Sequence, residues 1–197
     1  MLERVLENLT PDCPHRITVV CLKEHYEEMK SLHVDKLLTI DEVTGGAAIT
    51  ARFGVGSNEN LYGPVMIANS DQLLTWDVND FLRNAEGATG QVALFPSDGT
   101  KKWSHAVTHG HKVTWVSEKD LVTPWATCGV YWWRDVETFR YSTDCLIKDG
   151  VKTNGEYYLA PAMNYVSYVR AYWVDAMYGL GTPEDLCAYL TTIPKQG

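Results

Sequence analysis

The chain has 197 residues, enough for one domain, and its content of 45% hydrophobic and 21% charged residues is that of an ordinary folded globular protein. Its 17 Lys and Arg against 25 Asp and Glu give a formal net charge of −8, which disfavours binding to nucleic acids and to anionic membrane surfaces. The longest apolar run, Ile17–Leu22, is far shorter than the roughly 20 residues of a membrane-spanning helix, so we expect no membrane partner.

The sequence favours a cytoplasmic protein. The first residues, Met1–Val5, lack the basic stretch and the following apolar run of a secretory signal peptide. The five cysteines are an odd number, are widely spaced and form no C-x-x-C pair, so we expect reduced thiols rather than disulfides or a zinc knuckle. A homo-oligomer is compatible with these features.

In chain order, the first half alternates helices and strands. Apolar residues at 2, 5, 6 and 9 predict a helix over Leu2–Leu9, and the β-branched run Ile17–Leu22 is typical of a strand buried on both faces of a parallel sheet. There follow a helix over 23–30, a strand over 36–40, a helix after the glycine turn at 44–46, a strand over 65–68, a helix over 78–83 and a strand over 91–96. This order predicts an α/β fold with a Rossmann-like, mostly parallel sheet, right-handed crossovers and flanking helices.

The second half predicts a small antiparallel α+β insertion and a closing helix. Segments 103–108 and 112–118 alternate in polarity around His109-Gly110-His111 and predict a hairpin. The other predicted elements are a strand over 126–133, a helix over 135–148, a loop leading into a helix over 154–169, a strand over 170–174 and a helix over 183–190 with Thr182 as its N-cap. We expect one domain over 1–192 and a C-terminal tail over 193–197.

Three polar clusters follow predicted strands, where open α/β sheets bind their ligands. The first is the glycine turn formed by Thr44, Gly45 and Gly46. Its backbone could approach a flat ligand closely, and the helix that follows offers free N–H groups. A plain glycine-dependent turn between a strand and a helix explains the same residues.

The second cluster follows the strand over 65–68 and contains Asn69 and Asp71. A carboxylate in this position can hold Mg²⁺, which prefers oxygen ligands and often takes one or two carboxylates plus substrate phosphates. An aspartate that caps the next turn is an equally good interpretation of the sequence.

The third cluster combines Glu118 and Lys119, after a hairpin strand, with Asn154 and Glu156. The Lys119 ammonium could neutralise a phosphate, and the two glutamates could accept hydrogen bonds from sugar hydroxyls. Each of these residues taken alone is more often a solvated surface charge.

The sequence gives no support to several common catalytic chemistries. It contains no G-x-S-x-G, H-E-x-x-H, G-x-x-x-x-G-K-[ST] or G-x-G-x-x-G motif. His109 and His111 have no cysteine or third histidine nearby, so we interpret them as a solvent-exposed turn rather than a metal site.

Taken together and in order, the clusters resemble the sugar-phosphate nucleotidylyltransferase family, the NTP transferases with a glycosyltransferase-A-like fold. The resemblance runs from residue 1 to about 190. The segments that carry it are Thr44–Ala48 (T-x-G-x-A), Ile67–Gln72 (a strand-end Asp motif), Ser117–Lys119 (E-K), Ala126–Tyr131 (T-G-x-Y), Asn154–Pro161 (N-G-E-[FY]-Y of a smaller bacterial and phage branch) and Gly179–Leu186 (that branch's G-x-G-T-P-x-D-L ending).

The resemblance implies transfer of a nucleotidyl group from an NTP to a sugar 1-phosphate, or a phosphomonoester such as phosphocholine, with release of pyrophosphate. The catalytic residues would be Asp71 and Lys119. The other implied contacts are Thr44, Gly45, Gly46 and Asn69 for the nucleotide, Glu118, Gly129, Asn154 and Glu156 for the sugar, and Asp71 for Mg²⁺. The family's second metal-binding Asp falls on Gly179 in this sequence, so we expect Asp175, the nearest carboxylate, to replace it.

The start of the chain departs from the family pattern. Family members usually begin with a strand, a G-x-G-[ST]-R loop and a P-K-P-L segment, whereas Met1–Leu9 resembles the helix that follows them. We therefore expect an N-terminally incomplete domain in which the neighbours of a missing central strand have unpaired edges. Two alternatives stay open: a non-catalytic binding or regulatory module that keeps the sugar-phosphate pocket, and a glycosyltransferase, whose D-x-D motif Asn69-Ser70-Asp71 matches by half.

Overall fold

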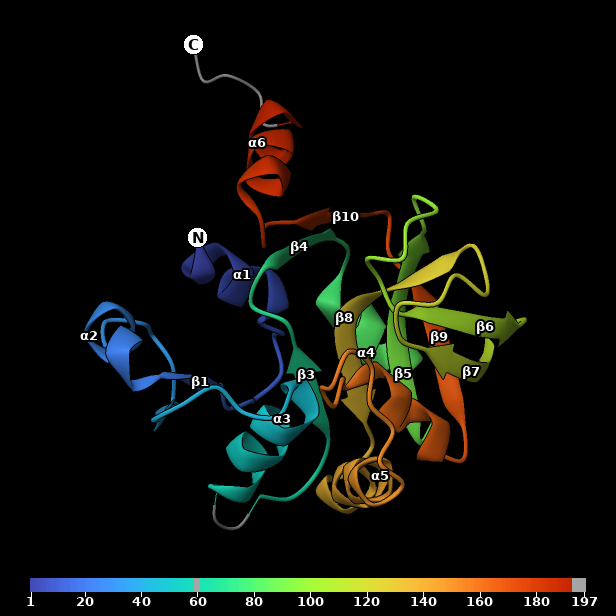
Figure 1. The fold of residues 1–197 in the computed structure, drawn as a ribbon, viewed down its shortest axis with the longest axis horizontal. Coiled ribbons are helices and arrows are strands. Elements are labelled where there is room, and N and C mark those ends of the chain that lie inside the picture. The colour runs from blue at the N-terminus through green and yellow to red at the C-terminus, as the bar shows by residue number, and fades with distance from the viewer. Residues whose placement is uncertain (59–60, 193–197) are drawn as a thin grey trace.

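A six-stranded mixed sheet forms the centre of the computed structural model, which describes residues 1–58 and 61–192 (Figure 1). Its strands lie in the order β3, β8, β5, β9, β7 and β6. They comprise β3 (Val65–Ala68), β5 (Gly90–Pro96), β6 (His105–His109), β7 (Lys112–Ser117), β8 (Trp125–Trp133) and β9 (Val169–Trp173).

The predicted mostly parallel Rossmann-like sheet is wrong for these six strands. β8 runs antiparallel to both β3 and β5, β7 runs antiparallel to both β9 and β6, and the β5–β9 pair alone is parallel. The first strand of the hairpin also returns to β8 through His105 and Ala126, which gives the sheet a barrel-like closure. Apolar runs predicted burial, but burial does not fix strand direction, because a strand covered on both faces looks the same with either kind of neighbour.

Strand β8 is buried along almost its whole length because both of its faces are covered. Successive side chains of a strand point to opposite faces. Tyr131 and Trp133 pack in a core cluster with Phe139 of helix α5 (Val136–Lys148), whereas Val130 and Trp132 pack in a second cluster on the other face. The strand therefore connects two separate halves of the core.

A separate two-stranded parallel sheet consists of β1 (Thr18–Leu22) and β2 (Lys36–Ile40). The predicted burial of β1 on both faces is wrong, since all five of its residues are half-buried. Within residues 1–58 and 61–192, β1 pairs with β2 alone and β3 pairs with β8 alone, so each has one open edge there. Helix α3 (Ala47–Gly56) packs near β1 and β3. Gly54 lies close to the Val20 side chain of β1, and Val55 shares a core cluster with Ile67 of β3.

The sequence did not predict a short antiparallel pair made by β4 (Gln72–Thr75) and β10 (Ala176–Gly179). Helices α1 (Leu2–Leu9) and α6 (Pro183–Thr192) pack beside it, around a small cluster of Val5, Leu73 and Leu180. The amide of Asn8 fixes α1 to this pair, because it both donates to and accepts from the backbone of Leu74.

The remaining helices are close to their predicted places. They are η1 (Lys23–His25), α2 (Tyr26–Met29), α4 (Val78–Asn84) and η2 (Ala160–Tyr165). The Thr182 hydroxyl accepts a hydrogen bond from the Asp185 N–H, which confirms Thr182 as the cap of α6. No helix in the described part of the chain is long and apolar enough to span a bilayer. The predicted tail over 193–197 lies outside the described residues.

The open, half-buried β1–β2 pair should be less stable than the centre of the molecule. We expect amide hydrogens of β1 and β2 to exchange with solvent at least about tenfold faster than those of β5 and β8, because local opening there breaks few buried contacts. Hydrogen exchange followed by mass spectrometry or NMR measures both regions in one sample. Equal protection in the two regions would contradict this expectation.

Candidate functional site

Gly129, in the middle of β8, is where the second predicted cluster meets the central sheet. Its backbone has φ +68°, and a Cβ atom there would lie 2.5 Å from the side-chain nitrogens of both Asn69 and Gln72. Its carbonyl also accepts a hydrogen bond of 3.0 Å from the Asn69 N–H. Glycine at 129 is therefore required by the close approach of the residues on either side of Asp71.

The same face of β8 carries Thr127 and Tyr131, whose hydroxyl groups are 2.8 Å apart. Next to them, the buried Ser104 hydroxyl donates a hydrogen bond to the Glu118 carboxylate. Burial raises the pKa of Glu118, and the bond from Ser104 and the charge of Lys119 act against this shift. Burial also raises the pKa of Tyr131. This part of the site is thus a hydrogen-bonded network around one carboxyl group.

Lys119 extends the network towards the segment that contains Glu156. It has a left-handed backbone, with φ +54°, and its ammonium donates a 2.6 Å hydrogen bond to the Tyr158 hydroxyl. This bond raises the pKa of Lys119; the charges of Glu118 and Glu156 act in the same direction, and burial opposes them. The structure therefore brings the predicted third cluster together.

Asn154 has a clear structural role in this segment. Asn154 and Gly155 have φ +51° and +84°, and the N–H and C=O groups of Thr153 and Glu156 exchange two 3.0 Å hydrogen bonds. Two central residues with positive φ are the mark of a type I′ turn, for which Asn-Gly is the preferred pair. The turn explains the N-G signal, and a contact of Asn154 with a sugar stays a prediction.

The glycine turn packs against the residue that precedes Tyr158. Tyr157 donates its N–H to the Gly45 carbonyl at 2.9 Å and accepts from the Ala48 N–H at 3.0 Å. Gly46 has φ +129°, and a Cβ there would lie 2.5 Å from the Tyr157 carbonyl oxygen. Gly46 is thus fixed by backbone packing, whereas Gly45 is exposed and Thr44 bonds to Thr50 at 2.7 Å. The first cluster consequently adjoins the third.

Asp71 directly precedes β4 and lies against the turn that leads to α6. Its carbonyl accepts a 2.7 Å hydrogen bond from the Leu180 N–H, and a Cβ at Gly181 would lie 2.5 Å from its Oδ2 atom. Glycine at 181 therefore lets the half-buried Asp71 carboxylate pack directly against the backbone of this turn. In the described part of the chain no Lys, Arg or His pairs with Asp71.

The structure does not bring Asp175 to Asp71. Asp175 lies just outside one end of the β4–β10 ladder, where its backbone N–H donates a hydrogen bond to the Thr75 carbonyl. Asp71 lies just outside the other end. The four-residue ladder between them spans about 10 Å, too far for two ligands of one Mg²⁺ ion. The carboxylate beside Gly179 is instead that of Asp185, 3.5 Å from the place of a Cβ, and it is paired with Lys102 at 2.6 Å.

Two groups of predicted site residues meet β8, since Asn69 packs against Gly129 and Glu118 bonds to Ser104 beside Tyr131. Four further residues of these contacts were not predicted as site residues, although three of them lie within the motif segments of the family resemblance; the four are Gln72, Ser104, Tyr131 and Tyr158. The alternation of β8 placed Tyr131 on the face of Gly129 and could have identified it. Nothing in the sequence marked Ser104. The N-G-E-[FY]-Y segment contains Tyr158, but its contact with Lys119 depends on which loops meet.

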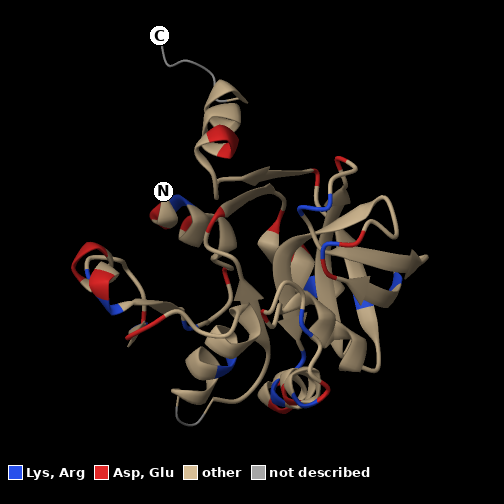
Figure 2. Ribbon diagram, in the orientation of Figure 1, with Lys and Arg blue, Asp and Glu red and all other residues tan. Residues whose placement is uncertain are grey.

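Figure 2 shows Lys and Arg interspersed with Asp and Glu over the whole molecule. Among the predicted site residues, Lys119 is the one cation, and the carboxylates are Asp71, Asp175, Glu118 and Glu156. An anionic ligand would therefore find one fixed positive charge and would need a metal ion to approach Asp71.

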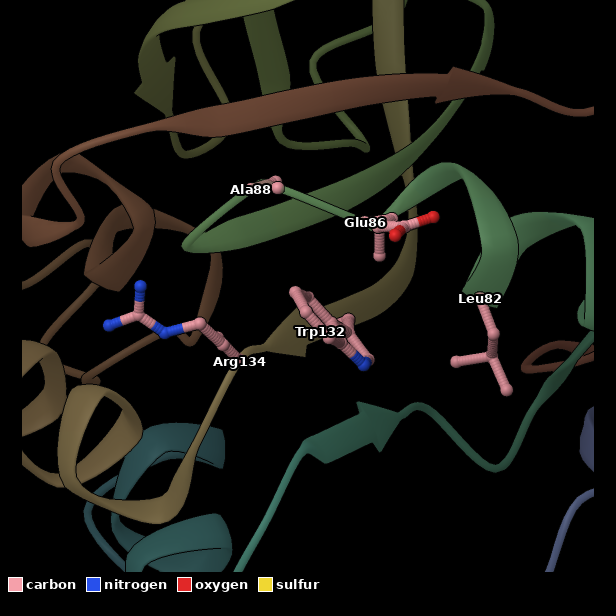
Figure 3. A pocket seen from close by; sticks show the side chains of 7 residues that line it. Leu82, Glu86, Ala88, Trp132 and Arg134 are labelled. Carbon is pink, nitrogen blue, oxygen red and sulfur yellow. The ribbon is translucent and has the colours of Figure 1, made fainter.

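A shallow pocket lies apart from the site (Figure 3). Its lining residues are Leu82, Ala85, Glu86, Gly87, Ala88, Trp132 and Arg134. Trp132 points to the face of β8 opposite Tyr131, and Arg134 follows the end of that strand. None of the predicted site residues lines this pocket, so we assign it no part in the chemistry.

The sequence matches no protein-family model and no curated protein. Several solved structures have a fold similar to that of this chain.

A nucleoside-diphosphate-sugar pyrophosphorylase of Vibrio cholerae RC9 is 18% identical, with a TM-score of 0.74 over 88% of this chain and 79% of that one. A putative glucose-1-phosphate thymidylyltransferase of Bacillus anthracis is 15% identical, with a TM-score of 0.73 over 92% and 78%. An inositol-1-phosphate CTP transferase of T. maritima is 11% identical, with a TM-score of 0.65 over 89% and 74%. The chain therefore has a sugar-phosphate nucleotidyltransferase-like fold.

Substitution of the glycines at the two ends of helix α3 tests the packing of the glycine turn. Gly46→Ala should lower the free energy of unfolding by about 2–4 kcal/mol, because the new methyl group collides with the Tyr157 backbone and φ is unfavourable. Gly56→Ala at the other end of the helix, with no atom within 4 Å of the new Cβ, should be neutral or stabilise by up to about 1 kcal/mol. Urea denaturation of both variants checks this, and a neutral Gly46→Ala would refute it.

The burial of Glu118 predicts a pH-dependent stability. Because folding raises the pKa of this carboxyl, its favourable contribution is present below the unfolded value of about 4.3 and is lost as pH rises through the folded value. Glu118→Gln lacks this titration, so its stability relative to the unmodified protein should increase from pH 4 to pH 7. Urea denaturation at several pH values measures the difference, and one that is constant or shrinks would contradict the assignment.

Proposed function

We propose that this protein transfers a nucleotidyl group from an NTP to a sugar 1-phosphate or a similar phosphomonoester and releases pyrophosphate. The observation that carries the proposal is that two of the predicted clusters meet β8: Gly129 packs against the neighbours of Asp71, and the Ser104–Glu118 bond that leads to Lys119 lies beside Tyr131. The fold shared with nucleotidyltransferases supports it.

The reaction needs charge neutralisation and positioning more than acid–base catalysis. A phosphate monoester is already a nucleophile, and it must approach the α-phosphorus of another anion in line with the leaving pyrophosphate. Lys119 would reduce the repulsion between the two anions by pairing with the attacking phosphate. A general base is unnecessary, which agrees with the absence of the common base-dependent motifs from the sequence.

Asp71 is the residue that would hold Mg²⁺. Its carboxylate is held in place by the close approach of Gly181 and has no cationic partner in residues 1–58 and 61–192, so its negative charge suits a small hard cation. When bound, Mg²⁺ supplies positive charge to the phosphate oxygens of the NTP. One protein carboxylate plus substrate phosphates is a usual ligand set for this ion.

The acceptor would lie between the third cluster and β8. Glu118 and Glu156 would accept hydrogen bonds from sugar hydroxyls, and the raised pKa of Glu118 also lets its protonated form donate one. The nucleotide would lie at the exposed side of the glycine turn, near Thr44 and Gly45. Both substrates are small molecules in this proposal.

Measurement of released pyrophosphate tests the function directly. The protein is incubated with each NTP, Mg²⁺ and a panel of sugar 1-phosphates and phosphocholine, and turnover is expected with at least one pair. Silence across the panel would overturn the proposal. Calorimetry then identifies the alternative of a binding module, which would bind a sugar phosphate but not Mg-NTP.

Two aspartates give a matched comparison. Asp71→Asn should lower kcat by at least about 100-fold, because the variant loses the carboxylate that holds the metal ion. Asp175→Asn should leave kcat within about twofold, because Asp175 lies beyond the far end of the β4–β10 ladder. Steady-state rates at saturating Mg²⁺ provide the comparison. Equal losses in the two variants would show that the metal site is elsewhere.

A further inference from the structure

Lys119 is held by a neutral group although two carboxylates act on it. Its ammonium donates a 2.6 Å hydrogen bond to the Tyr158 hydroxyl and lies 4.6 Å from the centroid of the same ring. Lys119 forms no ion pair within the described residues, even though the charges of Glu118 and Glu156 reach it. A phenol partner orients the ammonium without cancelling its charge. The positive charge is therefore kept for an anion.

The Tyr158 hydroxyl has hydrogen-bonding capacity left. A phenol has one proton to donate as well as lone pairs to accept. In residues 1–58 and 61–192, its one hydrogen bond is the one it accepts from Lys119, so its own proton has no acceptor there. An anion that contacts Lys119 can receive this proton in a second hydrogen bond.

Both partners are fixed by the backbone around them. Lys119 follows β7 in a left-handed conformation that a residue with a side chain rarely adopts. Tyr158 lies between Tyr157, whose backbone makes two hydrogen bonds to the glycine turn, and the buried Leu159. Backbone strain such as that at Lys119 often occurs where it positions a functional group. Because the backbone fixes both residues, the Lys119–Tyr158 pair is preorganised for a ligand.

We infer that Tyr158 is a second phosphate-binding group, which together with Lys119 recognises the phosphate of a monoester dianion. The pair provides a charge-assisted contact from the ammonium and a directed O–H donor from the phenol. The assignment of that phosphate to the sugar substrate rests on the proposed function.

Binding experiments test the pair without any turnover. Tyr158→Phe keeps the ring but removes the hydroxyl, and it should weaken binding of glucose 1-phosphate and of inorganic phosphate by about tenfold or more in calorimetry. Lys119→Met should weaken binding at least as much. The double variant should lose far less than the product of the two single losses, because the groups act together. Tyr141→Phe, the same change on the exposed surface of α5, should bind like the unmodified protein.

A second measurement reports on the contact itself. The pKa of Lys119, followed by NMR of its side chain, should fall in Tyr158→Phe, because the phenol oxygen raises it in the unmodified protein. A thermal melt close to that of the unmodified protein shows that the variant is folded. If Tyr158→Phe fails to fold, Tyr158→Leu, which also lacks a donor, replaces it in the binding series and must likewise bind at least about tenfold more weakly.

The outcomes separate this inference from the proposed function. Unchanged binding in Tyr158→Phe, or no phosphate binding by the unmodified protein, overturns the role of Tyr158. Weakened binding in the variant together with no pyrophosphate release by the unmodified protein supports the role of Tyr158 and overturns the nucleotidyl transfer.

Discussion

The alternation of side chains along β8 is the constraint on which both the core and the candidate site depend. One face carries the hydroxyl groups of Thr127 and Tyr131, and the other carries Val130 and Trp132 into a core cluster. Between Thr127 and Tyr131 the pairing with β5 shifts register, and Gly129 lies in this irregular stretch with a positive φ. A shift of register by one residue would exchange these two sets. The nine residues of β8 therefore determine both how the core packs and which polar groups face the candidate site.

Positive backbone angles occur where the clusters join. Gly46, Lys119, Gly129 and Asn154 all have φ between +51° and +129°. Two of the four are not glycine, so part of the folding energy is used to hold them in an unfavourable conformation. These backbone conformations allow loops from distant parts of the chain to approach closely enough for direct hydrogen bonds, such as those between Tyr157 and the glycine turn.

Much of the fold could be predicted from local patterns. Helix α1 and the strands β2 and β3 have the predicted ends, because apolar spacing and β-branched runs are local properties. Strand direction and the four-residue strands β4 and β10 could not be predicted, since both depend on partners far along the chain. The site shows the same division, because motif residues were found, whereas the separation of Asp71 from Asp175 and the contact of Lys119 with Tyr158 depend on tertiary structure.

Among the residues that the structure describes, β1 and β3 each have one edge without a strand partner. Exposed strand edges act as templates for backbone pairing with other polypeptides, and such pairing is the first step of many aggregates. Recognition of this kind depends little on side-chain identity, so protection must come from charges placed at the ends of the strand. Charged residues stand near both ends of β1, with Arg16 before the strand and Lys23, paired with Asp41, directly after it. Charges in such flanking positions disfavour growth of a sheet.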